Sequence, residues 1–316
     1  MLIVDAGADP WVVLHEDSYF YCHVIDDASV HLRSSDSLQG IGTVPAVEVW
    51  RPPAHLKNLW APELHALDGR WYIYVAADHG DNASHRMYVL SADQPVGPYV
   101  LDGQIGTEDD HWAIDGTVLH HSGPRGDRRY FVWSGWPEPH RTEEQHLYIA
   151  EMATPTTLRG PRVCIGVPTE PWEQSGMAVA EGPVALTSPG RTAIMYAASH
   201  SFTDDYCLAL LELVGDDPLD PDGWHKSSGP VLATSPGISG PGHASVVPTS
   251  DHTGWVVYHT HRQPGSGWDR QVRMAPYVWD ADRGLVITPD EAVTPLLVEP
   301  HNAAELYDDG DGAAVA

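Results

Sequence analysis

The feature that most constrains the fold is a repeat of about 55 to 65 residues, found five times along the 316-residue chain. Each copy starts with a short candidate strand, continues with a stronger aromatic or β-branched strand, and then has a third strand. The first strands of the copies are predicted at residues 9–13, 61–67, 115–120, 181–186 and 243–247. The chain is therefore expected to consist of similar sheets that follow one another.

The residues around these strands favour β-structure over helices. The chain contains 27 Pro and 29 Gly, which separate short runs rich in Val, Tyr, Ile and Trp. Fourth, outer strands are less distinct, with examples predicted at 162–165 and 292–297. We therefore predict an all-β fold, a five-bladed β-propeller of four-stranded antiparallel blades, whose radial arrangement leaves only short sheet edges.

The repeats predict a single propeller domain over residues 1–300, followed by an acidic C-terminal tail over residues 301–316. The tail has few large apolar residues, which is typical of a disordered segment. No basic leader region and no apolar run of about 18 residues is found. The chain as it stands is therefore expected to be cytoplasmic, or secreted if a leader peptide has been removed.

The charge and the aromatic content narrow the choice of partner. Acidic residues outnumber basic residues by 44 to 17, which gives a formal net charge of −27. A surface of this sign disfavours nucleic acid and anionic membranes as partners. The 12 Trp and 13 Tyr far exceed the 3 Phe. Amphipathic rings suit sites where an apolar face meets a polar ligand, and carbohydrate sites have this character.

Polar residues occupy equivalent positions at the starts of the first strands. These residues are Asp9, Asp115, Glu181 and His243, and Glu63 stands near the same position in the second repeat. In a propeller the innermost strands run along a central channel, so these positions should converge on one face. The repeat register thus predicts that three carboxylates, Asp9, Asp115 and Glu181, meet in one funnel.

Two carboxylates that flank one bond are the minimum equipment for glycoside hydrolysis. One protonates the leaving oxygen, and the other activates water or attacks the anomeric carbon. A third acid nearby can raise the pKa of the general acid and keep it protonated. Each acid also stands in or beside a turn-favouring pair that contains Pro or Gly, so closing a turn is the alternative role. The equivalent positions of all three acids favour catalysis.

The histidines leave more than one role open. His243 is either a core histidine or a residue that faces a hydrated cation or water in the channel, and hard cations prefer oxygen ligands. His259 and His261, two residues apart on a predicted strand, share one face. Because no third ligand stands at a suitable spacing, packing or substrate contact is favoured over a zinc site for this pair.

Five segments resemble glycoside hydrolase family 43, in order and over nearly the whole chain. They are residues 7–12, 59–64, 113–117, 181–183 and 240–245. That family consists of five-bladed propellers that hydrolyse arabinosides and xylosides with inversion of configuration. The resemblance implies that Asp9 is the general base, Glu181 is the general acid, and Asp115 tunes the pKa of the acid and orients it.

The same resemblance assigns further roles around the acids. Trp60 is expected to line the sugar pocket and Arg270 to hydrogen-bond sugar hydroxyls, with Trp133 as a further substrate contact. The axial histidine of the family, matched by His243, commonly faces a bound calcium ion or a water cluster. No cofactor is expected for the chemistry itself, and a structural calcium ion near His243 is an expectation from the family.

Finer features are most similar to the exo-acting α-L-arabinofuranosidases that trim 1,5-linked arabinan. These features are residues 85–87, 133–135, 148–152 and 273–276. The chain departs from the pattern at Ala180, where Asn is expected beside the acid, and at Ala275, where Gln is usual. The resemblance predicts release of L-arabinofuranose from arabinan or arabino-oligosaccharides, with α-1,5-linkages favoured. The alternatives are a β-xylosidase on the same scaffold and a sugar-binding or protein-binding propeller without catalysis.

Overall fold

The computed structural model describes residues 1–250, 252–280 and 282–289, and these residues fold almost entirely as β-strands. The predicted all-β class is confirmed. The helices in these ranges are four short 3-10 helices, η1 (Gln39–Gly42), η2 (Asn82–Ser84), η3 (Pro171–Glu173) and η4 (Pro221–Gly223). No helix in the described part of the chain is long and apolar enough to cross a membrane.

Consecutive strands pair antiparallel in groups of four. The first two groups are β2 (Trp11–His15), β3 (Ser18–Ile25), β4 (Ser29–Ser35) and β5 (Val47–Trp50), then β6 (Lys57–Leu67), β7 (Arg70–Asp78), β8 (Arg86–Ala92) and β9 (Val100–Gln104). The third group is β10 (Ala113–Gly123), β11 (Gly126–Gly135), β12 (Glu144–Thr154) and β13 (Thr157–Gly166). The fourth is β14 (Ala178–Ser188), β15 (Arg191–Ala198), β16 (Cys207–Leu213) and β17 (Trp224–Lys226), and the last is β18 (Gly242–Ser250), β19 (Thr253–His261), β20 (Arg270–Asp280) and β21 (Gly284–Ile287).

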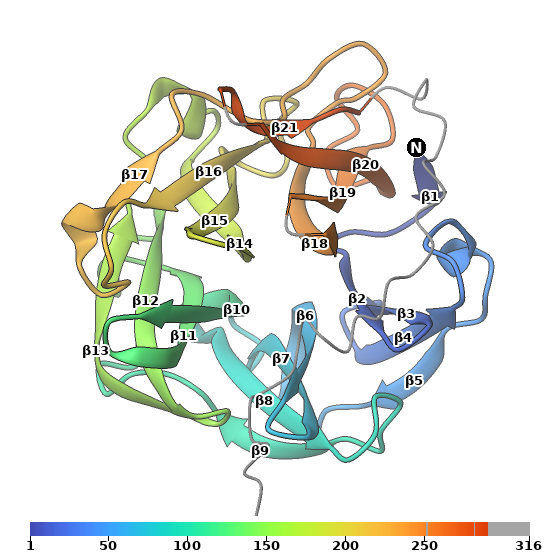
Figure 1. Ribbon diagram of the computed structural model, residues 1–316. Coiled ribbons are helices and arrows are strands. Elements are labelled where there is room, and N and C mark those ends of the chain that lie inside the picture. Colours follow the sequence, from blue (N-terminus) through green and yellow to red (C-terminus); the bar gives the residue numbers. More distant parts are fainter. Residues whose placement is uncertain (251, 281, 290–316) are drawn as a thin grey trace, which may run out of the picture.

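The groups lie around a common centre, with β2, β6, β10, β14 and β18 nearest to it (Figure 1). The strand β1 (Leu2–Val4) pairs with β20, so the beginning of the chain joins the last group. A short parallel pairing of β12 with β14 connects the third and fourth groups. Each predicted first strand lies within or overlaps one of the five inner strands, and the predicted outer strand 162–165 lies within β13. The predicted strand 292–297 and the tail 301–316 lie outside the described residues.

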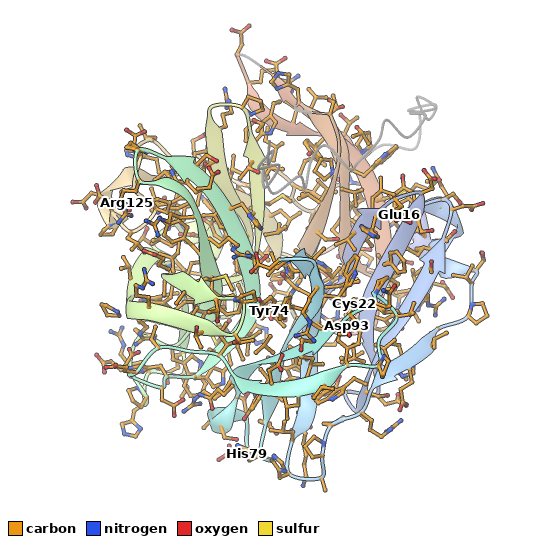
Figure 2. The ribbon with its side chains drawn as sticks, turned by 60° about the horizontal axis from the view of Figure 1, so that its bottom comes forward. Glu16, Cys22, Tyr74, His79, Asp93 and Arg125 are labelled. Atoms are coloured by element: carbon orange, nitrogen blue, oxygen red, sulfur yellow. The ribbon has the colours of Figure 1, made fainter. Side chains whose placement is uncertain are left out.

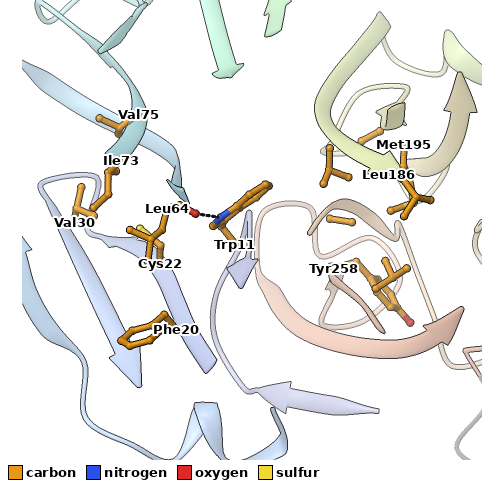
Figure 3. Close-up of a cluster of buried hydrophobic side chains, with 14 of the residues drawn as sticks. Trp11, Phe20, Cys22, Val30, Leu64, Ile73, Val75, Leu186, Met195 and Tyr258 are labelled. Atoms are coloured by element: carbon orange, nitrogen blue, oxygen red, sulfur yellow. Dashed lines mark hydrogen bonds between the residues drawn. The ribbon is translucent and has the colours of Figure 1, made fainter. Parts of the chain in front are cut away.

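The core lies between neighbouring groups rather than at the centre. Figure 3 shows Trp11, Phe20 and Cys22 of the first group facing Leu64 and Ile73 of the second. The indole Nε1 of Trp11 donates a 2.8 Å hydrogen bond to the backbone oxygen of Leu64, which ties the two groups together. Strands buried on both faces are rich in apolar residues throughout, and β7 is buried at every position after Arg70.

All inner strands begin at the same end of the sheets. The starts of β10, β14 and β18 pair with the ends of the following strands, as in Ala113↔Gly135 and Gly242↔His259. The loops between second and third strands therefore return to this end. They are residues 26–28, 79–85, 136–143, 199–206 and 262–269, and we call this end the loop face. In Figure 2, His79 of the loop face lies opposite the hairpin residues Glu16 and Arg125.

Candidate active site

A residue with left-handed backbone conformation stands just before each inner strand or within its first five residues. The φ angle is 46° at Asp9, 43° at Ala61, 56° at Asp115, 52° at Gly182 and 40° at His243. In β6, β10, β14 and β18 the pairing with the next strand shifts register at the same place. Such bulges redirect side chains next to active sites, and left-handed non-Gly residues cost about 1–3 kcal/mol each. Because of this shared distortion, the polar side chains near these positions do not follow the regular in-and-out alternation of a strand.

Asp9 lies among three cationic or ionisable groups. Its Oδ1 accepts a 3.3 Å hydrogen bond from Nη1 of Arg270 and lies 3.3 Å from Nδ1 of His259 and 3.4 Å from Nδ1 of His243. Burial by itself raises the pKa of Asp9, but Arg270, His243 and His259 outweigh it and hold that pKa well below its usual range. Asp9 is therefore ionised at neutral pH and can accept a proton.

Glu181 has the opposite behaviour. Burial raises its pKa to about 7, and the charge of Asp9 adds to the increase, whereas the hydroxyl of Tyr206 and the charge of Arg270 oppose it. The Oη of Tyr206 donates a 2.9 Å hydrogen bond to Oε1 of Glu181. Glu181 therefore holds a proton over much of the neutral range and can donate it.

Asp115, on β10, contacts the backbone next to Glu181. Its Oδ2 accepts a 3.0 Å hydrogen bond from the backbone N–H of Gly182, the residue after Glu181, and lies 3.9 Å from Nδ1 of His243. Burial raises the pKa of Asp115 well above its usual value, and the charges of Glu181 and Asp9 raise it further. Asp115 therefore both fixes the backbone beside Glu181 and interacts electrostatically with its carboxyl group.

Close contacts require glycine at two positions, one in segment 181–183 and one in segment 240–245. A Cβ at Gly242 would lie 1.9 Å from Cε1 of Tyr206, so only glycine leaves room for the ring that holds Glu181. A Cβ at Gly182 would lie 3.0 Å from Cγ of His243, at a position whose φ is also left-handed. The Glu-Gly and Gly-His pairs thus have a packing reason as well as a conformational one.

Glu63, the acid of the second repeat, is buried against a histidine. It is buried, and its Oε2 lies 2.9 Å from Nε2 of His65. Burial raises the pKa of Glu63 well above its usual value, and the charge of Asp115 adds to this effect. Burial and the contact with His65 therefore indicate a packing role for Glu63.

His243 lies between Asp9 and Asp115, and burial lowers its pKa. Calcium takes about six to eight oxygen ligands. Within residues 1–250, 252–280 and 282–289, no group of three or more His, Cys, Asp and Glu side chains is arranged to hold a metal ion. These side chains alone do not make a calcium site, and a calcium ion near His243 stays a prediction from the family resemblance.

Trp60 and Arg270 each have a free group or surface suited to a sugar. The indole of Trp60 stacks on the imidazole of His85, with centroids 3.9 Å apart and an interplanar angle of 24°. The buried Nε of Arg270 has no hydrogen-bond partner among the described residues. An unpaired buried donor costs about 1–3 kcal/mol, which a ligand oxygen can recover. Arg270 can therefore hydrogen-bond a hydroxyl group beside Asp9.

Trp133 is not brought to the acids. Its side chain is only 4% exposed and belongs to the buried cluster between the second and third strand groups. Its ring contacts are with Phe131, at a centroid distance of 6.0 Å, and Tyr148, at 6.1 Å. On strand β11 the alternation of side chains directs Trp133 into this core. The structure thus gives Trp133 a packing role.

Two residues to which the sequence analysis assigned no role also contribute to the site, Tyr206 and His85. Tyr206 stands directly before β16, in no segment of the repeat pattern, and its ring stacks on His259 at 5.5 Å. His85 is fully buried, and its Nε2 and Nδ1 lie 3.0 Å and 3.2 Å from the backbone oxygens of Asn58 and Asn82. His259, for which packing or substrate contact is favoured, lies with its Nδ1 3.3 Å from Oδ1 of Asp9. For Tyr206, its aromatic character was the only sequence signal.

Comparison with known proteins places this geometry in a family. The sequence pattern of Glycosyl hydrolases family 43 matches residues 3–284. The chain is 32% identical over 326 residues to the extracellular exo-alpha-(1->5)-L-arabinofuranosidase of Streptomyces avermitilis, with 96% of this chain and 66% of that protein covered. It is 32% identical over 273 residues to the enzyme of the same name from Streptomyces chartreusis, with 82% and 81% covered.

The fold is shared with a solved enzyme. The crystal structure of alpha-L-arabinofuranosidase from Lactobacillus brevis matches with a TM-score of 0.80 and 30% sequence identity, and 90% of this chain and 94% of that chain are covered. The chain spans just under two thirds of the length of the Streptomyces avermitilis relative. On the extent of the family match and of these similarities, this chain belongs to glycosyl hydrolase family 43.

Proposed function

We propose that the chain is an inverting, exo-acting α-L-arabinofuranosidase whose sheets form a five-bladed β-propeller of four-stranded antiparallel blades. The observation that carries the proposal is the contrast between Asp9 and Glu181, because one carboxyl group is held ionised and the other is held protonated. Two acids with pKa values pushed apart are the arrangement that acid–base hydrolysis of a glycoside needs.

In this mechanism Glu181 donates its proton to the glycosidic oxygen as the bond from that oxygen to C1 breaks. Asp9 takes a proton from a water molecule that attacks C1 from the opposite face, so the anomeric configuration inverts. Glu181 is then ionised and Asp9 protonated, and exchange with water restores both. The hydrogen bond from Gly182 to Asp115 supports a positioning role for Asp115 next to the acid.

Substrate contacts are proposed from the groups that remain unpaired. Arg270 presents a buried Nε without a partner in the described part of the chain, and it would donate to a hydroxyl of the sugar being released. Trp60, supported from behind by His85, would pack against the apolar face of that sugar. The substrate is then an arabinose-containing oligosaccharide or polysaccharide.

The preference for arabinose and for α-1,5-linkages is supported by the names of the two Streptomyces relatives. Both are named as extracellular enzymes, which supports secretion of this protein over the cytoplasmic expectation. The retained Asp9, Asp115 and Glu181 support catalysis over sugar binding alone.

The function is tested with paired substrates. The protein should hydrolyse 4-nitrophenyl α-L-arabinofuranoside and α-1,5-arabinobiose, and it should be much less active on 4-nitrophenyl β-D-xylopyranoside. Proton NMR during the first minutes should show the β-anomer of arabinofuranose as the first product. Preference for the xyloside would identify a β-xylosidase, an initial α-anomer would exclude inversion, and tight binding without turnover would leave a sugar-binding protein.

A further inference from the structure

Two large aromatic side chains are exposed next to each other on the loop face. Phe202, in the loop between β15 and β16, is 52% exposed, and Trp268, in the loop between β19 and β20, is 60% exposed. Their ring centroids lie 5.1 Å apart at an interplanar angle of 76°, and the ring of His200 lies 6.2 Å from Trp268. We call Phe202 and Trp268 the aromatic pair.

The aromatic pair is held in place by its own loops. The indole Nε1 of Trp268 donates a 3.3 Å hydrogen bond to Oγ of Ser201. A Cβ at Gly267 would lie 2.4 Å from Cε2 of Phe202, and the φ of Gly267 is 57°, so glycine is needed for Phe202 to lie against the second loop. The backbone N–H of Phe202 also donates to Nδ1 of His200 at 3.2 Å.

Asp204 connects the two loops to each other. Its Oδ1 lies 2.8 Å from Nδ1 of His261 and accepts a 2.6 Å hydrogen bond from Oγ of Ser239, and both carboxylate oxygens accept from the backbone N–H of Gly265 at 3.0 Å and 2.9 Å. The other ring nitrogen of His261 lies 3.0 Å from the backbone oxygen of Ser201. An exposed surface that is tied down in this way is preorganised, which lowers the entropic cost of binding a ligand.

The aromatic pair stands close in the chain to two residues that contact the carboxyl groups of the proposed mechanism. Trp268 stands two residues before Arg270, which contacts Asp9, and this separation spans at most about 7 Å of chain. Phe202 stands four residues before Tyr206, which contacts Glu181. Since Glu181 is on the leaving-group side of the reaction, the loop that carries Phe202 borders the same side.

We propose that the aromatic pair is a binding platform for the arabinofuranose ring on the leaving-group side of the bond that is cleaved. Exposed indole and phenyl faces bind the apolar faces of sugar rings, while bulk water reaches the hydroxyl groups at the edges. The inference rests on the proposed glycosidase function and extends it by naming residues that bind the part of the substrate that leaves.

The test compares substrates with and without a sugar as leaving group. Trp268→Ala and Phe202→Ala should each raise KM for α-1,5-arabinotriose by about tenfold, which corresponds to about 1.4 kcal/mol. On methyl α-L-arabinofuranoside, kcat/KM should stay within about twofold of the wild-type value. Trp268→Tyr should restore most of the affinity for arabinotriose. Val214→Ala, at an apolar residue that is 71% exposed, is the matched control. It should change neither the KM for arabinotriose nor the kcat/KM for the methyl glycoside.

A binding measurement separates failure of this inference from failure of the proposed function. In the Glu181→Gln background, calorimetric titration with arabinotriose should give a Kd about tenfold higher when Trp268 is also replaced by Ala. Equal losses on both substrates, or an unchanged KM and Kd for arabinotriose, would overturn the platform while leaving the glycosidase proposal standing. A wild-type dimer that Trp268→Ala converts to a monomer would instead identify the pair as a contact between two copies and overturn the platform.

Discussion

Tyr206 donates a hydrogen bond of 2.9 Å to Oε1 of Glu181 from a ring that is completely buried. Because Oε1 is occupied as an acceptor, Oε2 is the oxygen left to carry the proton that is transferred to the substrate. The same hydrogen bond opposes the increase that burial imposes on the pKa of Glu181. Tyr206 therefore influences both the orientation and the acidity of the proposed general acid.

Replacing Tyr206 with Phe should raise the pKa of Glu181 above its present value of about 7. The wild-type kcat/KM should fall as the pH rises through about 7, because the acid must be protonated, and the variant should lose activity only at higher pH. The full pH profile measures this shift. Tyr258→Phe removes another buried hydroxyl, one without a hydrogen-bond partner in the described residues, and should leave the profile unchanged. Coinciding profiles for wild type and Tyr206→Phe would contradict the assigned contact.

Replacing Asp115 with Asn should move the profile in the opposite direction. The ionisation of Asp115 and that of Glu181 oppose each other, so the substitution removes a carboxyl group that competes with Glu181 for ionisation, and it keeps an oxygen that can accept from the backbone N–H of Gly182. The pKa of Glu181 should therefore fall, and the loss of activity on the alkaline side should begin at lower pH. Asp93→Asn, at a side chain that is 85% exposed, is the control. A profile that stays in place would leave Asp115 with only its structural hydrogen bond.

Gly242→Ala should cost more stability than an ordinary surface substitution. The new Cβ would lie 1.9 Å from the ring of Tyr206, and overpacking of this kind typically costs about 1–3 kcal/mol. Urea denaturation should show this decrease in the free energy of unfolding, and activity should fall because Tyr206 is displaced from Glu181. Gly215→Ala meets no atom within 4 Å and serves as the comparison. Equal stability of both variants would refute the predicted clash.

Metal removal should leave the chemistry intact. The proposed proton transfers use only Asp9 and Glu181, so no step of the reaction requires a cation. Dialysis against a chelator should therefore change kcat by less than about twofold, and adding calcium should not raise it. A large loss of kcat that calcium reverses would show that the reaction depends on a bound cation, whereas a change in melting temperature alone would indicate a structural ion.

The repeat register was sufficient to predict the inner strands and the acids at their starts. It worked because equivalent positions of successive sheets meet at one end, where Asp9, Asp115 and Glu181 are now found to share neighbours. Tyr206 could not be predicted, because it reaches Glu181 through a loop whose path depends on Gly242 in another sheet. Tertiary contacts of this kind leave no local periodicity.

Trp133 shows a difference between the family resemblance and the packing in the structure. The family resemblance suggested a substrate contact, but the alternation of β11 directs this indole into the core between two sheets. The short outer strands β5, β9 and β17 were also hard to predict, since edge strands of three to five residues carry too few side chains to show a clear pattern. Burial of Trp133 and of these outer strands depends on the neighbouring sheets and not on the sequence of the strand itself.

The central claim, that Glu181 is the acid and Asp9 the base, is tested most directly by the dependence on the leaving group. Glu181→Ala should lose most activity on α-1,5-arabinobiose, whose leaving oxygen needs a proton, and retain much more on 4-nitrophenyl α-L-arabinofuranoside, whose leaving group does not. Asp9→Asn should lose about 10²–10⁴-fold on both substrates, because water must be activated in either case. Equal losses on the two substrates for Glu181→Ala would contradict the assignment.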